Sequence, residues 1–216
     1  MYKEDKKKKD ATVQEAEAAY KLQMEKTQGE YTVEDYLAWP EDERVELIDG
    51  VIYEMASPID RHQLIASEIG NILRNFIKEN QGECIPFSAP IDVQLDMDDK
   101  TMVQPDVLVV CDRNKLKNGR LFGAPDFVAE VLSPSSRKKD SYIKLGKYSN
   151  ANVREYWLVD PDKKRIVVYD FANEELAKVY TFKEKVPVSI FNGHCEVDFA
   201  EIYEYIRFLY EEEYKL

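Results

Sequence analysis

The segment at residues 127–132, F-V-A-E-V-L, contains one acid inside an otherwise apolar run. Aromatic and β-branched residues on both sides of the acid predict a buried β-strand. A carboxylate in such a strand is costly to bury unless another group pairs with it or neutralises it. Glu130 therefore needs a partner, and the identity of that partner bears on both the fold and the function.

Two nearby features offer partners for Glu130. Asp106 precedes the apolar run V-L-V-V, so we expect it at the start of a neighbouring buried strand. Lys144 belongs to the charged, helical segment that follows the strand of Glu130. It is one turn from Asp140 and one turn from Tyr148, so these three side chains share a helix face.

Two acids on neighbouring strands can resolve their repulsion in three ways. One acid is protonated, a base pairs with them, or both bind one cation. Oxygen ligands suit Mg²⁺, which polarises phosphoryl oxygens and activates water, and a nearby lysine could orient that water. The plain alternative is an edge-strand Glu paired with Arg or Lys, and a Pro-Asp pair that forms an ordinary turn. The residues alone leave these alternatives open.

Helix and strand patterns alternate along the chain, which predicts an α/β (α+β-like) fold around a mixed sheet. Thr32 is a good N-cap, and Asp49-Gly50 between two β-prone runs predicts a hairpin. The expected helices span Val33–Trp39, Asp60–Glu79 with Asp60 as its cap, Arg137–Asn150, and a last one from Asp198. The expected strands span Cys84–Phe87, Ile91–Leu95, Val103–Val110, Phe127–Leu132, Glu155–Asp160, Arg165–Asp170 and Lys178–Phe182.

The charge balance bears on the possible partners. The net charge of -12 disfavours nonspecific binding to nucleic acid. The charge is uneven, however: five bases and one acid lie between Ser135 and Tyr148, and the local field matters more than the sum. A nucleic-acid function is therefore not excluded.

The cysteines and the N-terminus indicate a cytoplasmic protein. Cys84, Cys111 and Cys195 are scattered and odd in number, which is typical of reduced thiols. No apolar run approaches the roughly 18 residues of a membrane span, and the basic N-terminus lacks the apolar region of a secretory signal. We expect a charged extension with helical propensity over residues 1–30, and one folded domain over residues 31–216.

Other kinds of site lack their patterns. His194-Cys195 stands alone, because the other cysteines are far away in the sequence and no zinc spacing occurs. No G-x-S-x-G motif surrounds a serine, and the eight glycines form no phosphate-binding loop. These observations favour ordinary structural roles for those residues.

Six motifs in order resemble the Uma-type restriction endonuclease family, a branch of the PD-(D/E)XK nuclease superfamily. They are R-V-E-L-I-D-G, S-P-I-D-R-H, P-D-V-L-V-V, E-V-L-S-P-S, D-S-Y-I-K-L-G-K-Y and E-Y-W-L-V-D-P, between Tyr31 and Phe182. One such motif is weak, but six in the right order are specific.

The resemblance implies a restriction-endonuclease-like mixed central sheet flanked by helices. It also implies that Asp106 and Glu130 bind Mg²⁺, for which Mn²⁺ could substitute. The superfamily's usual pattern has a lysine two positions after the acid, where this chain has Leu132. The lysine would then come from the next helix, with Lys144 as the first candidate and Lys147 as the second.

Further residues are expected to support this site. Glu46 matches an additional metal-binding acid, and His62 matches a histidine that meets phosphate or water, although a hydrogen bond at the helix N-terminus explains it equally well. The resemblance implies a homodimeric, Mg²⁺-dependent endonuclease that hydrolyses DNA; the alternative is a catalytically inactive nuclease-fold module that binds nucleic acid or a partner protein. Candidate supporting residues are Gln104, Asp140 and Lys147, and candidate DNA-backbone contacts are Arg137, Lys138 and Lys139.

Overall fold

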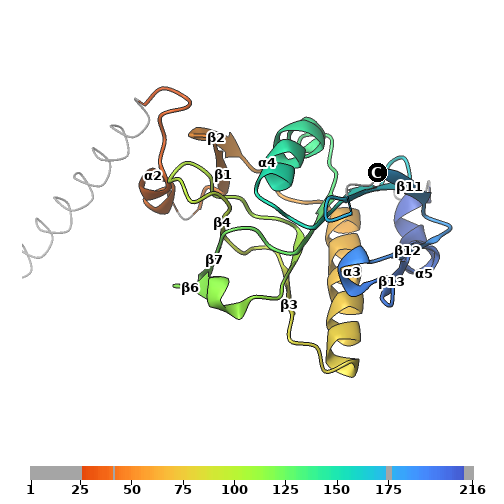
Figure 1. Cartoon of the computed structure of the whole chain (residues 1–216). Helices are drawn as coiled ribbons and strands as arrows, with labels where there is room; N and C mark the ends of the chain where they lie inside the picture. Colours follow the sequence, from red (N-terminus) through yellow and green to blue (C-terminus); the bar gives the residue numbers. More distant parts are fainter. Residues whose placement is uncertain (1–25, 41, 174–176, 212–216) are drawn as a thin grey trace, which may run out of the picture. The chain divides into compact units, whose positions relative to one another are not determined.

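The computed structural model describes residues 26–40, 42–173 and 177–211 (Figure 1). They form two compact units: the first comprises the described residues up to Met55 together with Asp98–Met102, and the second comprises Ala56–Met97 and the described residues from Val103 onward. Most of the predicted N-terminal extension lies outside the described residues. Within the described ranges, no helix is long and apolar enough to cross a membrane.

The first unit contains a short helix and a hairpin. In α2 (Val33–Leu37), Thr32 is the N-cap and accepts a hydrogen bond from the Asp35 backbone N–H, as predicted. Strands β1 (Val45–Ile48) and β2 (Val51–Glu54) pair antiparallel across Asp49-Gly50. Both turn residues have positive φ, 52° and 76°, which a tight two-residue hairpin requires. The predicted hairpin is confirmed.

The second unit is built on a six-stranded mixed sheet. Among the described strands of this sheet, the central β8–β9 pair alone is parallel, and the other neighbours are antiparallel. The predicted mixed sheet is confirmed. Its order is β11 (Lys178–Thr181), β10 (Arg165–Asp170), β9 (Glu155–Asp160), β8 (Phe127–Val131), β5 (Val107–Val110) and β3 (Ile85–Ser88).

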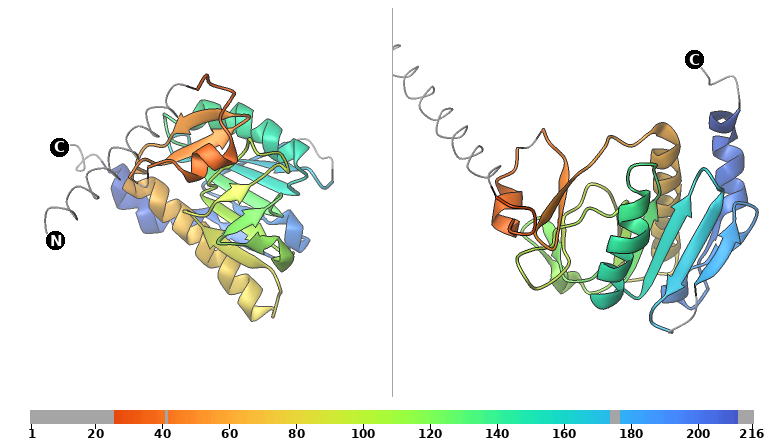
Figure 2. Two further views of the ribbon diagram at one scale, coloured as in Figure 1. Left: turned by 90° about the vertical axis from the view of Figure 1, so that its left-hand side faces the viewer. Right: turned by 90° about the horizontal axis from the view of Figure 1, so that it is seen from above.

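Helices cover both faces of this sheet. Helix α3 (Asp60–Glu79) and helix α5 (Phe199–Ile206) share one apolar core with the side chains of alternate strand residues such as Ala129 and Trp157. Because neighbouring strand residues point to opposite faces, Glu130 points away from that core, toward α4 (Leu145–Asn150). Figure 2 shows α4 and α5 on opposite sides of the sheet.

Three of the predicted helices differ in detail, and the first of them ends at Leu37, not at Trp39. Asp60 is the first residue of α3 and not its cap; Ile59 is the N-cap and makes no side-chain capping bond. The segment predicted as a helix over Arg137–Asn150 begins as a π-helix, η2 (Lys139–Lys144), and continues as α4.

Short elements complete the second unit. The predicted strand Ile91–Leu95 is reduced to β4 (Val93–Gln94), and several very short strands were not predicted because two or three residues carry no period. A three-stranded sheet joins β4 to β7 (Arg120–Phe122) and β7 to β6 (Leu116–Lys117). A two-stranded sheet joins β12 (Lys185–Pro187) and β13 (Glu196–Asp198). The 3₁₀ turns are η1 (Arg113–Lys115), η3 (Ser189–Phe191) and η4 (Arg207–Tyr210).

The prediction of three reduced cysteines is wrong for two of them. Cys84 and Cys111 form a disulfide across 27 residues of sequence. Cys84 directly precedes Ile85 of β3 and Cys111 directly follows Val110 of β5, and because Ile85 pairs with Val110, strand pairing brings the two cysteines together. Cys195 is free and buried, and burial raises the pKa of its thiol to about 11.

Candidate active site

Asp106 and Glu130 lie opposite each other on neighbouring strands. Because β5 and β8 pair antiparallel with Val107 facing Ala129, the next pair outward is Asp106 and Glu130. The Asp106 backbone N–H donates to Glu130 Oε2 at 3.2 Å, and the Val131 N–H donates to Asp106 Oδ2 at 2.8 Å. Each carboxylate is thus held by the backbone of the other strand, and the two predicted acids are brought together.

The η2–α4 segment supplies the partners of Glu130. Lys144 Nζ donates to Glu130 Oε1 at 2.8 Å, and the Tyr148 hydroxyl donates to the same oxygen at 2.9 Å. The Glu130 side chain is only 3% exposed, and Lys144 and Tyr148 are buried as well. A base therefore pairs with the buried carboxylate, which offsets the cost of its burial.

The π-helix is part of this arrangement. Lys144 Nζ also lies 3.7 Å from Asp140 Oδ1, so two acids share its charge. The Tyr156 hydroxyl donates to the backbone oxygen of Asp140 at 3.1 Å, which ties the π-turn to the sheet. Burial, followed by the nearby carboxylates of Glu130 and Asp140, raises the pKa of Tyr156 well above its ordinary value. Single π-turns occur frequently at functional sites, and this one presents Lys144 to Glu130.

His62 lies in the first turn of α3 and contacts the site. Its Nε2 is 3.1 Å from Asp106 Oδ2. Burial acts to lower the pKa of this imidazole, but the Asp106 carboxylate outweighs it, so the pKa is raised. The buried Nδ1 has no hydrogen-bond partner in the described part of the chain. The His62 side chain is therefore turned to the acid pair, not used as a helix-terminal hydrogen bond.

Two of the other predicted supporting residues, Lys147 and Gln104, pair with acids other than Asp106 and Glu130. Lys147 pairs with Asp96, so Lys144 is the lysine at Glu130. Gln104 donates from Nε2 to Asp92 Oδ1 at 3.0 Å.

Glu46 lies in the first unit, on β1, where it is fully buried. Its predicted part in metal binding stays a prediction.

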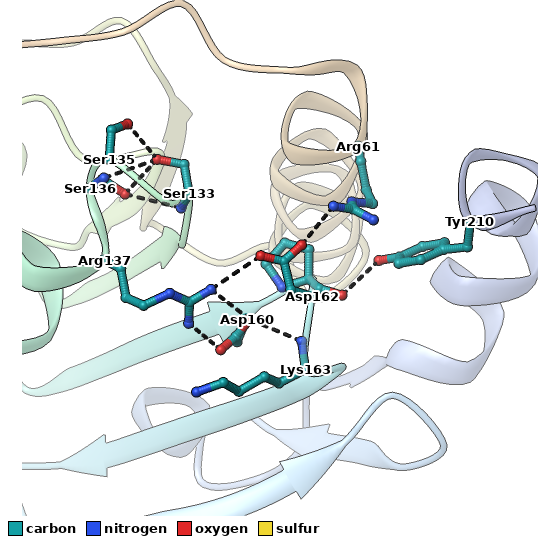
Figure 3. A network of polar contacts seen from close by, with 10 residues as sticks. Arg61, Ser133, Ser135, Ser136, Arg137, Asp160, Asp162, Lys163 and Tyr210 are labelled. Carbon is teal, nitrogen blue, oxygen red and sulfur yellow. Dashed lines mark hydrogen bonds and ion pairs between the residues drawn. The ribbon is translucent and has the colours of Figure 1, made fainter. Parts of the chain in front are cut away.

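The predicted DNA contacts follow β8. Arg137 is bound to Asp160 and Asp162 (Figure 3). Lys138 is exposed and Lys139 is partly buried. Sequence reasoning missed both acidic partners of Arg137, because they lie more than 20 residues away. It also missed the Tyr148–Glu130 contact, although the spacing of four residues from Lys144 was a signal for a shared face.

Comparisons with known proteins agree with this architecture. Residues 33–195 match the family described as "Uma2: Putative restriction endonuclease". The chain is 30% identical over 139 residues to the uncharacterized protein slr1290 of Synechocystis sp., a match that covers 63% of this chain and 72% of that protein.

A solved structure gives the same fold. The crystal structure described as "a putative nuclease belonging to DUF820 from Anabaena variabilis" is similar with a TM-score of 0.67 and 22% sequence identity. The similarity covers 81% of this chain and 98% of that one, and it supports the fold alone. The sequence match over residues 33–195 spans three quarters of the chain and includes the Asp106–Glu130 pair, and the chain belongs to the Uma2 family of putative restriction endonucleases.

Proposed function

We propose that this chain is a Mg²⁺-dependent endonuclease that hydrolyses phosphodiester bonds of DNA. The observation that carries the proposal is the convergence of Asp106 and Glu130 on neighbouring strands, with Lys144 Nζ 2.8 Å from Glu130. Two carboxylates and one lysine are the parts expected for the PD-(D/E)XK superfamily. Membership in the family supports the same reading.

The donor set fits Mg²⁺, and Mn²⁺ as a substitute. Mg²⁺ prefers oxygen ligands and usually takes one or two carboxylates while it keeps several waters. The Glu130 side chain is buried, but the side chain of Asp106 is 17% exposed, so solvent reaches the pair from the Asp106 side. Asp106 and Glu130 would hold the ion, which supplies Lewis acidity to a phosphoryl oxygen and to a water.

The protein's own groups perform the remaining tasks. Lys144 is held between Glu130 and Asp140, so its ammonium is fixed in place before substrate arrives. A fixed cation stabilises negative charge that develops on the phosphate and can orient the attacking water. Tyr148 helps to fix the carboxylate of Glu130, and His62 does the same for Asp106. The basic residues Lys138 and Lys139 would attract the DNA backbone.

A second candidate function is a catalytically inactive nuclease-fold module that binds nucleic acid or a partner protein. Leu132 occupies the position of the superfamily's usual lysine and is buried. Lys144 already neutralises Glu130, and the net charge of -12 is unfavourable for DNA. These observations favour the module only if Lys144 cannot serve as the substitute lysine.

Cleavage of plasmid DNA and single-stranded DNA tests the proposal. The wild type is compared with Lys144→Ala and with Lys147→Ala, a matched control three residues further on in α4, in Mg²⁺, Mn²⁺ or EDTA. We expect Lys144→Ala to lose cleavage by roughly 100-fold or more, as for the loss of a group that stabilises the transition state. Lys147→Ala should stay within a few-fold of the wild type. Absence of cleavage by the wild type with either metal would contradict the enzyme and favour the binding module.

We also propose a homodimer, because many nucleases of the superfamily cut two strands with two subunits. Light scattering should then give a mass of about twice the 25.2 kDa of one chain. A species at the mass of one chain over the working concentration range would contradict this.

A further inference from the structure

Two arginines from distant parts of the second unit meet at one surface carboxylate. Arg61 Nη2 lies 2.7 Å from Asp162 Oδ1, and Arg137 Nη2 lies 3.3 Å from Asp162 Oδ2 (Figure 3). Asp162 is in the turn between β9 and β10, and its side chain is 45% exposed. A single, accessible anion therefore bridges two cations.

A second acid, Asp160, holds Arg137 in place independently of Asp162. Its guanidinium makes a two-point contact with Asp160, in which Nη2 donates to Oδ1 at 3.1 Å and Nη1 donates to Oδ2. Asp160 is 10% exposed and also accepts from the Lys163 backbone N–H at 3.1 Å. Burial acts to raise the pKa of Asp160, but the hydrogen bonds from Arg137 and Lys163 outweigh it and lower the pKa. Asp160 therefore fixes Arg137 whether or not Asp162 is present.

Arg61 has its own support. Its guanidinium carbon lies 4.6 Å from the centre of the Tyr210 ring, and the Tyr210 hydroxyl donates to the Pro161 carbonyl oxygen at 3.2 Å. The Nε atom of Arg61 is buried and has no acceptor among the residues that the structure describes. Asp162 thus leaves part of the donor capacity of this guanidinium unused.

Both arginines are linked to the acid pair through the chain. Arg61 directly precedes His62, whose imidazole contacts Asp106. Arg137 begins the helical segment that follows the loop leaving the strand of Glu130. Reciprocal hydrogen bonds of 3.1 Å between Ser133 and Ser136 fix this loop.

We propose that Arg61 and Arg137 form a subsite for a backbone phosphate of the substrate, and that Asp162 occupies this subsite in the free protein. Planar guanidinium groups recognise a phosphate and a carboxylate through the same paired geometry, so one anion can replace the other. The source of the phosphate, a DNA strand, rests on the proposed function. Asp162 is then an internal competitor that lowers affinity for the substrate, and Asp160 is a positioning residue for Arg137.

Removal of the competitor tests the proposal. Binding of a short labelled DNA duplex is measured by fluorescence anisotropy, with Ca²⁺ in place of Mg²⁺, over a series of salt concentrations. We expect Asp162→Asn to bind about 10-fold more tightly than the wild type, with a salt dependence steeper by about one phosphate contact. The double variant Arg61→Gln/Asp162→Asn should lose this gain.

Glu79→Gln is the matched control, because it removes the same charge at the other end of α3 on an exposed side chain. It should bind as the wild type does. If Asp162→Asn and Glu79→Gln give the same affinity and the same salt slope, Asp162 only ties the turn to its neighbours and the subsite is refuted. If Asp162→Asn does not fold, Arg61→Gln decides: weaker binding supports the subsite, and unchanged binding overturns it.

A second probe separates this proposal from the nuclease proposal. Broadening of the ³¹P resonance of inorganic phosphate should be greater with Asp162→Asn than with the wild type, and least with Arg61→Gln. That order, with no DNA cleavage by the wild type, would leave the subsite standing and refute the nuclease. Cleavage of DNA without any effect of Asp162→Asn on either probe would refute the subsite alone.

Discussion

Two buried glutamates on neighbouring strands of the same sheet are satisfied in different ways. Glu155 on β9 accepts from the Trp157 indole at 2.7 Å and from the Ile190 backbone N–H at 3.0 Å, both neutral donors. Glu130 on β8 accepts from the Lys144 ammonium, together with Tyr148. Neutral donors satisfy a carboxyl group without a counter-charge, whereas a buried cation keeps it ionised. We infer that Glu155 has a structural role and that Glu130 belongs to a functional site in which charged side chains bind metal and substrate.

The largest expected effect comes from removing the cation at Glu130. Lys144→Met should lower the free energy of unfolding by about 3–5 kcal/mol, because it leaves a buried carboxylate without its charged partner. Urea denaturation measures this. The double variant Lys144→Met/Glu130→Gln should recover much of the loss, since the unpaired charge is gone. A loss below about 1 kcal/mol for the single variant would mean that Lys144 contributes no more at Glu130 than a neutral hydrogen-bond donor does.

A smaller effect is expected from the pH dependence of Glu155. Burial, only partly offset by the hydrogen bonds from the Ile190 backbone and Trp157, raises the pKa of this carboxyl group above its unfolded value. Between the unfolded pKa and the folded pKa, the folded state binds more protons than the unfolded state does. The contribution of Glu155 to stability is therefore lost as the pH rises through this window.

Glu155→Gln should remove this part of the pH dependence, because the amide does not titrate. Urea denaturation at several pH values, from acidic to neutral, would show a flatter loss of stability with rising pH than in the wild type. Glu79→Gln, exposed at the end of α3, serves as the control and should leave the slope unchanged. An identical slope for Glu155→Gln and the wild type would contradict the raised pKa of Glu155.

Local sequence signals predicted much of the fold. Thr32, the Asp49-Gly50 turn and the apolar stripe of α3 each act within a few residues, and the structure contains all three. The proximity of Asp106 and Glu130 was also predictable, because Asp106 directly precedes one strongly apolar strand and Glu130 lies within another.

Long-range geometry was not predictable in the same way. The Cys84–Cys111 disulfide depends on the antiparallel register of β3 and β5, which no local pattern specifies. The π-turn over Lys139–Lys144 has the same composition as an α-helix, so periodicity could not reveal it. The contacts of Arg137 with Asp160 and Asp162 join segments that only the folded sheet brings together.

Calorimetric titration with Mg²⁺ tests most directly whether Glu130 and Glu155 differ in function. The wild type and Glu155→Gln should bind the ion with similar affinity, whereas Glu130→Gln should show no measurable binding, since one of two proposed carboxylate ligands is lost. Circular dichroism would verify that each variant is folded. Equal Mg²⁺ binding by Glu130→Gln and the wild type, or no binding by the folded wild type, would contradict the assignment of Asp106 and Glu130 as the metal site.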